Sequence, residues 1–251
     1  MAERLTSRKK EKVARMRKLG TDAAFRRECG EFLCEGLHLL GEAVREHFSV
    51  TEVFFDGRDE NAGREAAALG VPVTLVSPEI IAHCSTTVAP QGVLFSAKIP
   101  DLSRLPRGER FLILDSVADP GNVGTAIRSA DAFGLDGVLL TGAVADPFSP
   151  KVVRASMGAV FRVPIFRFEK EKAAGVFSDL GVPVYSAILG GENLRTADLS
   201  RAAVVIGNEA AGVSPEIRAA CRRGLMIPMA GRAESLNAGV AASIFAWEMS
   251  K

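Results

Sequence analysis

The chain has 251 residues, of which 47% are hydrophobic and 24% charged, and its net charge is +1. This composition indicates a globular protein with a substantial core and excludes a globally disordered chain. No segment is long and apolar enough to predict a membrane span, and the basic start of the chain lacks the apolar stretch of a signal peptide, so a cytoplasmic location is expected. The length fits one large domain or two modest ones, and two is our working interpretation.

The cysteines and histidines do not have the spacing of a metal site. The four cysteines are scattered, at Cys29, Cys34, Cys84 and Cys221. Because no Cys-x-x-Cys pair or companion histidine cluster occurs, we expect reduced thiols and no bound metal.

The start of the chain is locally basic. Between Arg4 and Lys18 it carries eight basic residues against a single acidic one. Val13, Met16 and Leu19 recur at helical spacing, so a helix is predicted here. Such a surface can neutralise phosphates and bind RNA without sequence preference. A solvated helix face fits the same pattern equally well.

Helical and strand patterns alternate from residue 31 to residue 98. We expect helices over 31–46, 64–70 and 78–84, and strands over 50–56, 71–77 and 92–98. The interpretation is a small α/β domain over 31–98. A basic extension over 1–30 precedes it, and an irregular linker with two prolines follows over 99–109.

A second α/β series fills residues 110–251. Expected strands cover 111–115, 137–142, 163–168, 183–189, 202–207 and 225–229; expected helices cover 122–134, 150–158 and 169–181, with two more starting near Pro215 and Leu236. Apolar strands that alternate with helices predict a mainly parallel sheet.

Three segments of this series combine glycine, asparagine and a charged residue just after a predicted strand, where parallel sheets bind ligands. In the first, Asn122 is expected to cap a helix and Arg128 to face the sheet edge from its early turns. A simple surface salt bridge of Arg128 is the competing interpretation.

The second segment is a loop after a β-branched run. It contains Gly207, Asn208, Glu209 and Gly212, and glycine lets backbone approach a ligand closely. Glu209 is expected to accept hydrogen bonds from ribose hydroxyls or to pair with Arg128, although a plain turn explains the glycines as well. The spacing fits neither the dinucleotide fingerprint nor a phosphate loop, which argues against NAD and ATP.

The third segment places Ser235 and Asn237 at the start of the last helix, after an apolar strand and a glycine turn. Helix capping is a sufficient explanation for Ser235 alone. It does not explain why all three segments occur together.

Together the three segments resemble, in the same order, the signature motifs of the SpoU/TrmH family of RNA 2′-O-ribose methyltransferases, in the SPOUT superfamily. The resemblance covers Phe111 to the end of the chain. The matching positions are Asn122, Gly124, Arg128, Gly207, Asn208, Glu209, Gly212, Ile227, Pro228, Met229, Ser235, Leu236 and Asn237. Lys151, Arg154, Ser156 and Gly158 resemble a further stretch of the family. After Asn237, Ala238 and Gly239 stand where many members carry a bulkier pair.

The resemblance implies a C-terminal methyltransferase domain over 110–251 with a trefoil-knotted SPOUT fold, S-adenosylmethionine as cofactor and homodimerisation through this domain. The implied catalytic residues are Arg128, Asn122, Glu209, Ser235 and Asn237. The implied cofactor-binding residues are Gly207, Ile227, Leu236, Asn208, Gly212, Met229 and Ile206. Residues 31–98 resemble the ribosomal-protein L30e-like RNA-binding domain that is common in the family.

The expected function is 2′-O-methylation of a ribose in RNA, with 23S or another ribosomal RNA preferred as partner because of the additional domain. A guanidinium stays protonated at neutral pH, so we favour an electrostatic role for Arg128 over that of a general base. The alternatives are a tRNA 2′-O-methyltransferase, a non-catalytic RNA-binding ribosome-assembly factor, and a methyltransferase that acts on a protein or small molecule. The target nucleotide and a role in antibiotic resistance are left open.

Overall fold

The computed structural model describes residues 4–59, 64, 67–68, 70–71, 73–232 and 234–251. Its contacts divide the chain into two compact units. The N-terminal unit comprises Met1–Pro100 and Phe148–Phe161, and the C-terminal unit comprises Asp101–Pro147 and Arg162–Lys251. Within the described part of the chain, no helix has the length and apolarity needed to cross a membrane.

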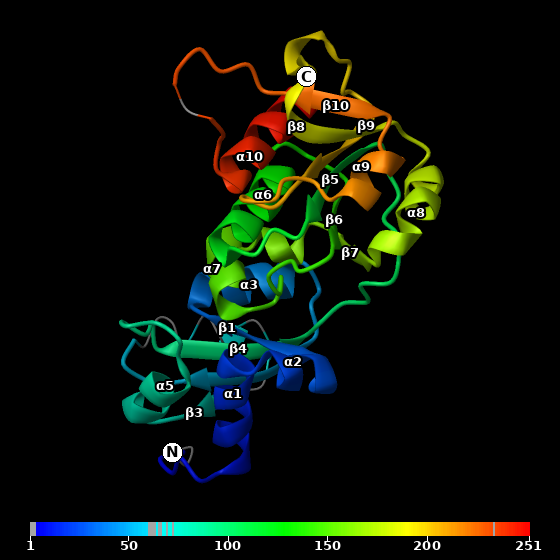
Figure 1. Cartoon of the computed structure of the whole chain (residues 1–251). Coiled ribbons are helices and arrows are strands. Elements are labelled where there is room, and N and C mark those ends of the chain that lie inside the picture. Colours follow the sequence, from blue (N-terminus) through cyan, green and yellow to red (C-terminus); the bar gives the residue numbers. More distant parts are fainter. Residues whose placement is uncertain (1–3, 60–63, 65–66, 69, 72, 233) are drawn as a thin grey trace. The chain divides into compact units, whose positions relative to one another are not determined.

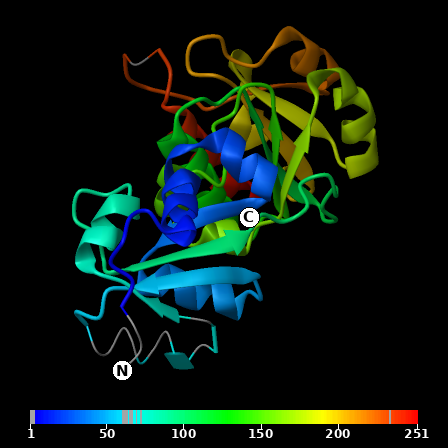
Figure 2. The same ribbon diagram turned by 90° about the horizontal axis from the view of Figure 1, so that it is seen from below.

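A four-stranded sheet forms the centre of the N-terminal unit (Figure 1, Figure 2). Its order is β1 (Glu31–Glu35), β4 (Val93–Lys98), β2 (Val50–Phe55) and β3 (Val73–Leu75). Strand β4 runs antiparallel to both neighbours, and β2 pairs with β3 in parallel. The helices that pack on it are α1 (Glu11–Thr21), α2 (Ala23–Cys29), α3 (Leu37–Arg45), α5 (Pro78–Cys84) and α7 (Pro150–Ser156).

The first half of the helix expected over 31–46 is wrong, because residues Glu31–Glu35 form a strand. Gly36, with φ of +104°, separates this strand from α3. Leu33 packs into the apolar cluster beneath α1, whereas the Phe32 ring lies 4.8 Å from the Phe148 ring, centroid to centroid. A strand that is buried on both faces shows no alternation of polar and apolar residues, so its pattern imitates a buried helix.

The other elements expected in this unit are found, with two qualifications. The first helix begins at Glu11 and a second helix, α2, follows it. The helix predicted over 64–70 falls largely outside the described residues. The four cysteines are free thiols, as expected.

Six parallel strands form the sheet of the C-terminal unit, as predicted for residues 110–251. The order is β10 (Arg223–Met226), β8 (Val184–Asn193), β9 (Ala202–Ile206), β5 (Arg110–Asp115), β6 (Gly137–Thr141) and β7 (Ile165–Phe168). Every neighbouring pair is parallel. Strand β10 ends at Met226, so the strand expected over 225–229 is displaced toward the start of the chain.

Helices cover both faces of this sheet (Figure 1). Helices α6 (Pro120–Ala132) and α10 (Ala238–Met249) pack on each other and on β5 and β9. On the other face, α8 (Ala173–Leu180) and α9 (Pro215–Ala220) pack together over a cluster that includes Phe111, Ile113 and Val205. Strand order alone does not reveal how the chain threads, so the trefoil knot stays a prediction.

The pairing of β5 with β9 positions the candidate site. Leu114 lies opposite Ile206 in the parallel register, so Asp115 and Gly207 follow side by side at the carboxyl ends of the two strands. Strand β5 also pairs with β6 on its other side. In open α/β sheets, ligands bind beside the carboxyl ends of the strands, so the candidate site is sought here.

A buried carboxylate ties the strands of the N-terminal unit to its first helix. The Glu31 side chain is 5% exposed. Its oxygens accept from the Thr51 hydroxyl at 2.9 Å and the Lys98 ammonium at 2.7 Å, and from the Arg15 guanidinium. Burial raises the pKa of Glu31, but these three donors outweigh it and hold the pKa below its ordinary value.

We expect Glu31→Gln to lower the free energy of unfolding at pH 7 by roughly 1–2 kcal/mol, because the amide loses charge-assisted bonds whose cations are partly solvated. A carboxyl with a lowered folded-state pKa stabilises the fold above its unfolded pKa, and this contribution fades as the pH falls through the folded value. The difference from the wild type should therefore shrink as the pH is lowered from neutral through the folded pKa of Glu31. Urea denaturation over a series of acidic pH values measures it. A penalty that stays constant over the whole series would exclude charge as its cause.

Candidate active site

Helix α6 is capped by Asp119, and the expected capping role of Asn122 is wrong. Asp119 Oδ1 accepts a hydrogen bond from the Asn122 backbone N–H at 2.9 Å, and Pro120 occupies the first helical position. Aspartate followed by proline is a common helix start, so this signal was present in the sequence. Because Asp119 satisfies the helix end, the Asn122 side chain is available for another contact.

That contact joins two of the three sequence segments. Asn122 Nδ2 donates to Glu209 Oε1 at 2.6 Å, across 87 residues of sequence. Glu209 therefore pairs with Asn122, and the expected pairing of Glu209 with Arg128 is not found. The second Glu209 oxygen accepts no hydrogen bond from any residue that the structure describes.

The third segment meets the first at Gly239. A Cβ atom on Gly239 would lie 3.1 Å from Thr125 Cβ and 3.2 Å from both Asn122 Oδ1 and Asn237 Oδ1. Asn237 caps α10, since its Oδ1 accepts from the backbone N–H of Gly239 at 2.9 Å and of Val240 at 3.2 Å. The close approach of α10 to α6 explains why a small residue stands here, and it brings Asn122, Glu209 and Asn237 into one cluster.

Arg128 and Ser235 are exposed and lie outside the hydrogen bonds of this cluster. Arg128 follows Thr125 by one helical turn, which places it beside the cluster on the surface of α6. Its guanidinium makes no hydrogen bond or ion pair within the described part of the chain. Ser235 precedes the α10 cap by two residues and is likewise exposed. Both side chains are thus free to meet a ligand.

The loop that follows β9 is held by backbone hydrogen bonds and by the Asn208 side chain. Asn208 and Gly212 exchange backbone hydrogen bonds of 3.0 and 2.9 Å, and Asn208 Oδ1 accepts from the N–H groups of Ala210 and Ala211, each at 3.0 Å. A Cβ on Gly207 would lie 2.2 Å from the Gly212 carbonyl carbon. Only glycine fits at this position unless the loop moves.

The remaining predicted cofactor contacts are apolar. Ile206 is buried at the end of β9, whereas Ile227, Met229 and Leu236 are half-buried on the segment that connects β10 to α10. Their partly open side chains leave apolar surface available next to this segment.

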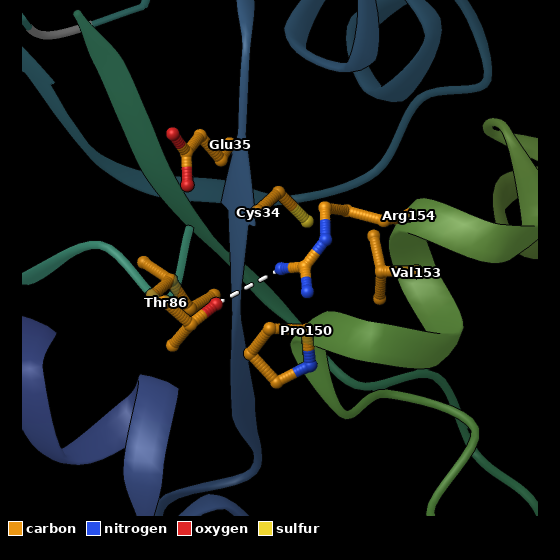
Figure 3. Close-up of a pocket in the computed structure, with 7 residues that line it drawn as sticks. Cys34, Glu35, Thr86, Pro150, Val153 and Arg154 are labelled. Atoms are coloured by element: carbon orange, nitrogen blue, oxygen red, sulfur yellow. Dashed lines mark hydrogen bonds between the residues drawn. The ribbon is translucent and has the colours of Figure 1, made fainter. Parts of the chain in front are cut away.

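Arg154, from the stretch over 151–158, belongs to the N-terminal unit. Its guanidinium donates to the Thr86 hydroxyl at 2.9 Å and borders a cavity of about 10 Å³ with Cys34, Glu35 and Val153 (Figure 3). A cavity of this size holds at most one water molecule. Arg154 thus makes its hydrogen bond within this unit, and the cavity is too small for a ligand larger than water.

Asp115, the last residue of β5, was not predicted as a site residue from the sequence. Its carboxylate is buried, and it contacts Lys170, Ser116 and Ser214. An acidic residue at the end of an otherwise apolar strand was the available signal, but the sequence did not indicate its partners.

The C-terminal unit is thus an α/β sheet unit with a cluster of polar and glycine residues at the carboxyl ends of two adjacent parallel strands. Residues 109–247 match the SpoU rRNA Methylase family, and residues 10–94 match the MRM3-like substrate binding domain. The chain belongs to the SpoU rRNA Methylase family.

Relatives resemble the chain along its whole length. It is 32% identical to the 23S rRNA (guanosine(2553)-2'-O)-methyltransferase RlmP of Bacillus subtilis, over 98% of this chain and 99% of that protein. It is also 32% identical to the 23S rRNA (uridine(2479)-2'-O)-methyltransferase of Streptomyces viridochromogenes, over 89% of this chain and 83% of that protein. The AdoMet-bound rRNA methyltransferase from Sinorhizobium meliloti matches with a TM-score of 0.87 and 33% identity, covering 99% of this chain and 97% of the other.

Proposed function

We propose that the protein transfers a methyl group from S-adenosylmethionine to a ribose 2′-oxygen of ribosomal RNA, with 23S rRNA as the preferred substrate. The observation that carries the proposal is the hydrogen bond between Asn122 and Glu209, which unites two signature segments beside an exposed arginine. The relatives from Bacillus subtilis and Streptomyces viridochromogenes described above are named for 2′-O-methylation of 23S rRNA. Because they modify different nucleotides, they support the RNA class rather than one target position.

The residues present fit an adenosyl cofactor. Gly207 and Gly212 approach each other closely at the two ends of the loop and place no side chain there, and adenosyl groups are readily bound by backbone N–H and C=O groups. Ile227, Met229 and Leu236 offer apolar surface for the base. When bound, the cofactor supplies an electrophilic methyl group on its sulfonium.

The protein must hold the target ribose in line and stabilise negative charge on its 2′-oxygen. The exposed guanidinium of Arg128 suits both tasks, because its planar fork binds a phosphate and its charge stabilises a developing alkoxide. A phosphate oxygen or water accepts the proton. The free oxygen of Glu209 accepts a hydrogen bond from a ribose hydroxyl. The Oδ1 of Asn237 is used by the helix cap, so its amide N–H groups are available to donate to the nucleotide. Ser235 adds a hydroxyl on the same side.

Arg128→Ala should lower kcat/KM by roughly 100- to 1,000-fold, the usual cost of losing a donor to a developing oxyanion. Arg128→Lys should recover little, since it lacks the bidentate fork. The measurement is transfer of labelled methyl from S-adenosylmethionine to unmodified total RNA, followed by alkaline digestion. A 2′-O-methyl group blocks alkaline cleavage, so the wild type should give labelled, alkali-resistant dinucleotides from ribosomal RNA.

Arg195→Ala is the matched control, because Arg195 is an exposed arginine of the same unit outside the cluster. It should leave the rate unchanged. Label found only on bases would refute ribose chemistry, and label confined to tRNA would refute the ribosomal substrate. RNA binding without any transfer would instead identify a non-catalytic assembly factor.

The N-terminal unit, in this proposal, selects the RNA, and three residues before α1 supply phosphate contacts. Several basic side chains of the first 18 residues serve the fold: Lys12 pairs with Glu52 at 2.7 Å, and Arg17 donates to the His83 carbonyl at 2.5 Å. Arg8, Lys9 and Lys10 are exposed, and their side chains make no hydrogen bond or ion pair with any described residue.

Replacing Lys9 and Lys10 together by alanine should weaken binding to ribosomal RNA fragments and make the slope of log affinity against log salt shallower by about 1–2, because fewer counterions are released. Fluorescence anisotropy over a salt series measures both effects. The charge-matched control is Lys172→Ala with Arg201→Ala, two exposed cations of the C-terminal unit. If both double variants weaken RNA binding and change the salt slope equally, the effect is one of net charge, and Lys9 and Lys10 have no special role.

We further propose a homodimer formed through α10. Val240 and Trp247 are 46% and 50% exposed, and the half-buried Ile244 lies between them at helical spacing. This apolar stripe faces away from the residues of α10 that pack on the sheet. Exposed apolar stripes of this kind are typical of interfaces, and a twofold dimer buries the same stripe on both copies.

A cytoplasmic location stays a prediction.

Trp247→Glu should convert the dimer to a monomer, because two charges would be buried opposite each other in the interface. Sedimentation velocity measures the change. Val88→Glu, at a fully exposed apolar position of the N-terminal unit, should leave the dimer intact. A wild-type protein that sediments as a monomer at all micromolar concentrations would contradict the proposal.

A further inference from the structure

One charged pair at the site has no part in the chemistry described above. Asp115, at the end of β5, has a side chain that is 1% exposed, and its Oδ1 lies 2.8 Å from the ammonium of Lys170. The same carboxylate accepts from the Ser116 hydroxyl at 3.0 Å and from the Ser214 backbone N–H at 2.7 Å. A buried carboxylate is costly unless it is paired and hydrogen-bonded, and here three donors surround it.

These contacts reach both ends of the loop that follows β9. Ser214 stands just beyond Gly212 and is held directly by the carboxylate. At the other end, the Ser116 carbonyl accepts from Asn208 Nδ2 at 3.0 Å. Ser116 has φ of +59°, an unusual conformation for a residue with a side chain. Its hydroxyl, bonded to Asp115, helps to fix this conformation and the direction of its carbonyl.

The local backbone also makes room for the cation. A Cβ on Gly142, just beyond the end of β6, would lie 2.6 Å from Lys170 Cε and 2.4 Å from the Ser116 hydroxyl. Gly142 has φ of +68°, which favours glycine as well. The Lys170 side chain therefore passes the carboxyl end of β6 through a space that a side chain at position 142 would fill.

The carboxylate is held in its ionised form. Burial raises the pKa of Asp115, but the Lys170 ammonium and the Ser214 N–H outweigh this effect and lower the pKa below its ordinary value. An asparagine could not replace it, because the amide NH₂ would face a donor, either Lys170 or the Ser214 N–H.

We infer that Asp115, with Lys170, is a positioning residue that holds the loop from Asn208 to Gly212 in the conformation that receives S-adenosylmethionine. This inference rests on the proposed function for the identity of the ligand. In this role the buried pair raises the affinity for the cofactor and does not contact the reacting atoms. The pair acts through Ser116 and Ser214, one at each end of the loop.

Asp115→Asn should raise the dissociation constant for S-adenosylmethionine at least roughly tenfold, the cost of one lost charge-assisted hydrogen bond. Isothermal titration calorimetry on the full chain, at a temperature where every variant is folded, measures it. Hydrogen exchange should become faster at the amides of Ala210, Ala211 and Ser214. Lys170→Met is the second variant and replaces Asp115→Asn if that variant does not fold. It should shift both readouts in the same direction as expected for Asp115→Asn.

Glu31→Gln is the matched control, since Glu31 is also a buried carboxylate paired with cations but lies in the N-terminal unit. It should leave both readouts unchanged. A purely structural role of Asp115 would lower the unfolding midpoint without changing the dissociation constant or the loop exchange, and that result would overturn the inference. A wild type that binds no S-adenosylmethionine would refute the proposed function, and unchanged exchange in Asp115→Asn would still refute positioning independently.

Discussion

The parallel pairing of β5 with β9 is the constraint on which the rest of the site depends. Their register sets Leu114 opposite Ile206, so two chain segments separated by about ninety residues leave the sheet side by side. The helix after β5 then carries Asn122 to Glu209 of the loop after β9. A shift of the pairing by one residue would turn the side chains of one strand to the wrong face of the sheet, and it would separate these groups.

The packing of α10 on α6 brings the third polar segment to the first two. Helix α10 lies on α6 closely enough that Gly239 has no space for a side chain beside Thr125, and the Ser129 and Ser243 hydroxyls lie 2.7 Å apart farther along the two helices. The last helix of the chain therefore delivers Asn237 to the first helix of the C-terminal unit. Three segments far apart in sequence share one small volume because one strand pair and one helix pair fix their ends.

Much of this arrangement could be predicted from the sequence, because apolar runs, glycine turns and cap residues are local signals. The alternation of strands and helices over 110–251 was clear, and it placed the three polar segments at strand ends. Local signals failed where two interpretations compete. Asp119 and Asn122 are both residue types that cap helix N-termini, and only one of them can occupy the N-cap position of α6. In strand β1, the consecutive residues Phe32, Leu33 and Cys34 place apolar side chains on both faces, as in a buried helix.

Contacts between distant residues were beyond the reach of sequence patterns. The basic stretch at the start of the chain gave no sign that Arg15 would pair with Glu31 while Lys9 stayed exposed. Nor did the apolar run of β5 indicate that its final carboxylate would meet Lys170, 55 residues later (115 to 170). Such partners follow from the fold, so they become visible only when the packed structure is known.

The return of Phe148–Phe161 to the N-terminal unit has a consequence for dissecting the protein. The Phe32 and Phe48 rings pack against the rings of Phe148 and Phe161, so the small unit is assembled from two separate pieces of chain. Cleavage at residues 99–109 would not release an intact domain, because it would strip an aromatic cover from β1. A separable small domain would need residues 148–161 joined to residues 1–100 through an added linker.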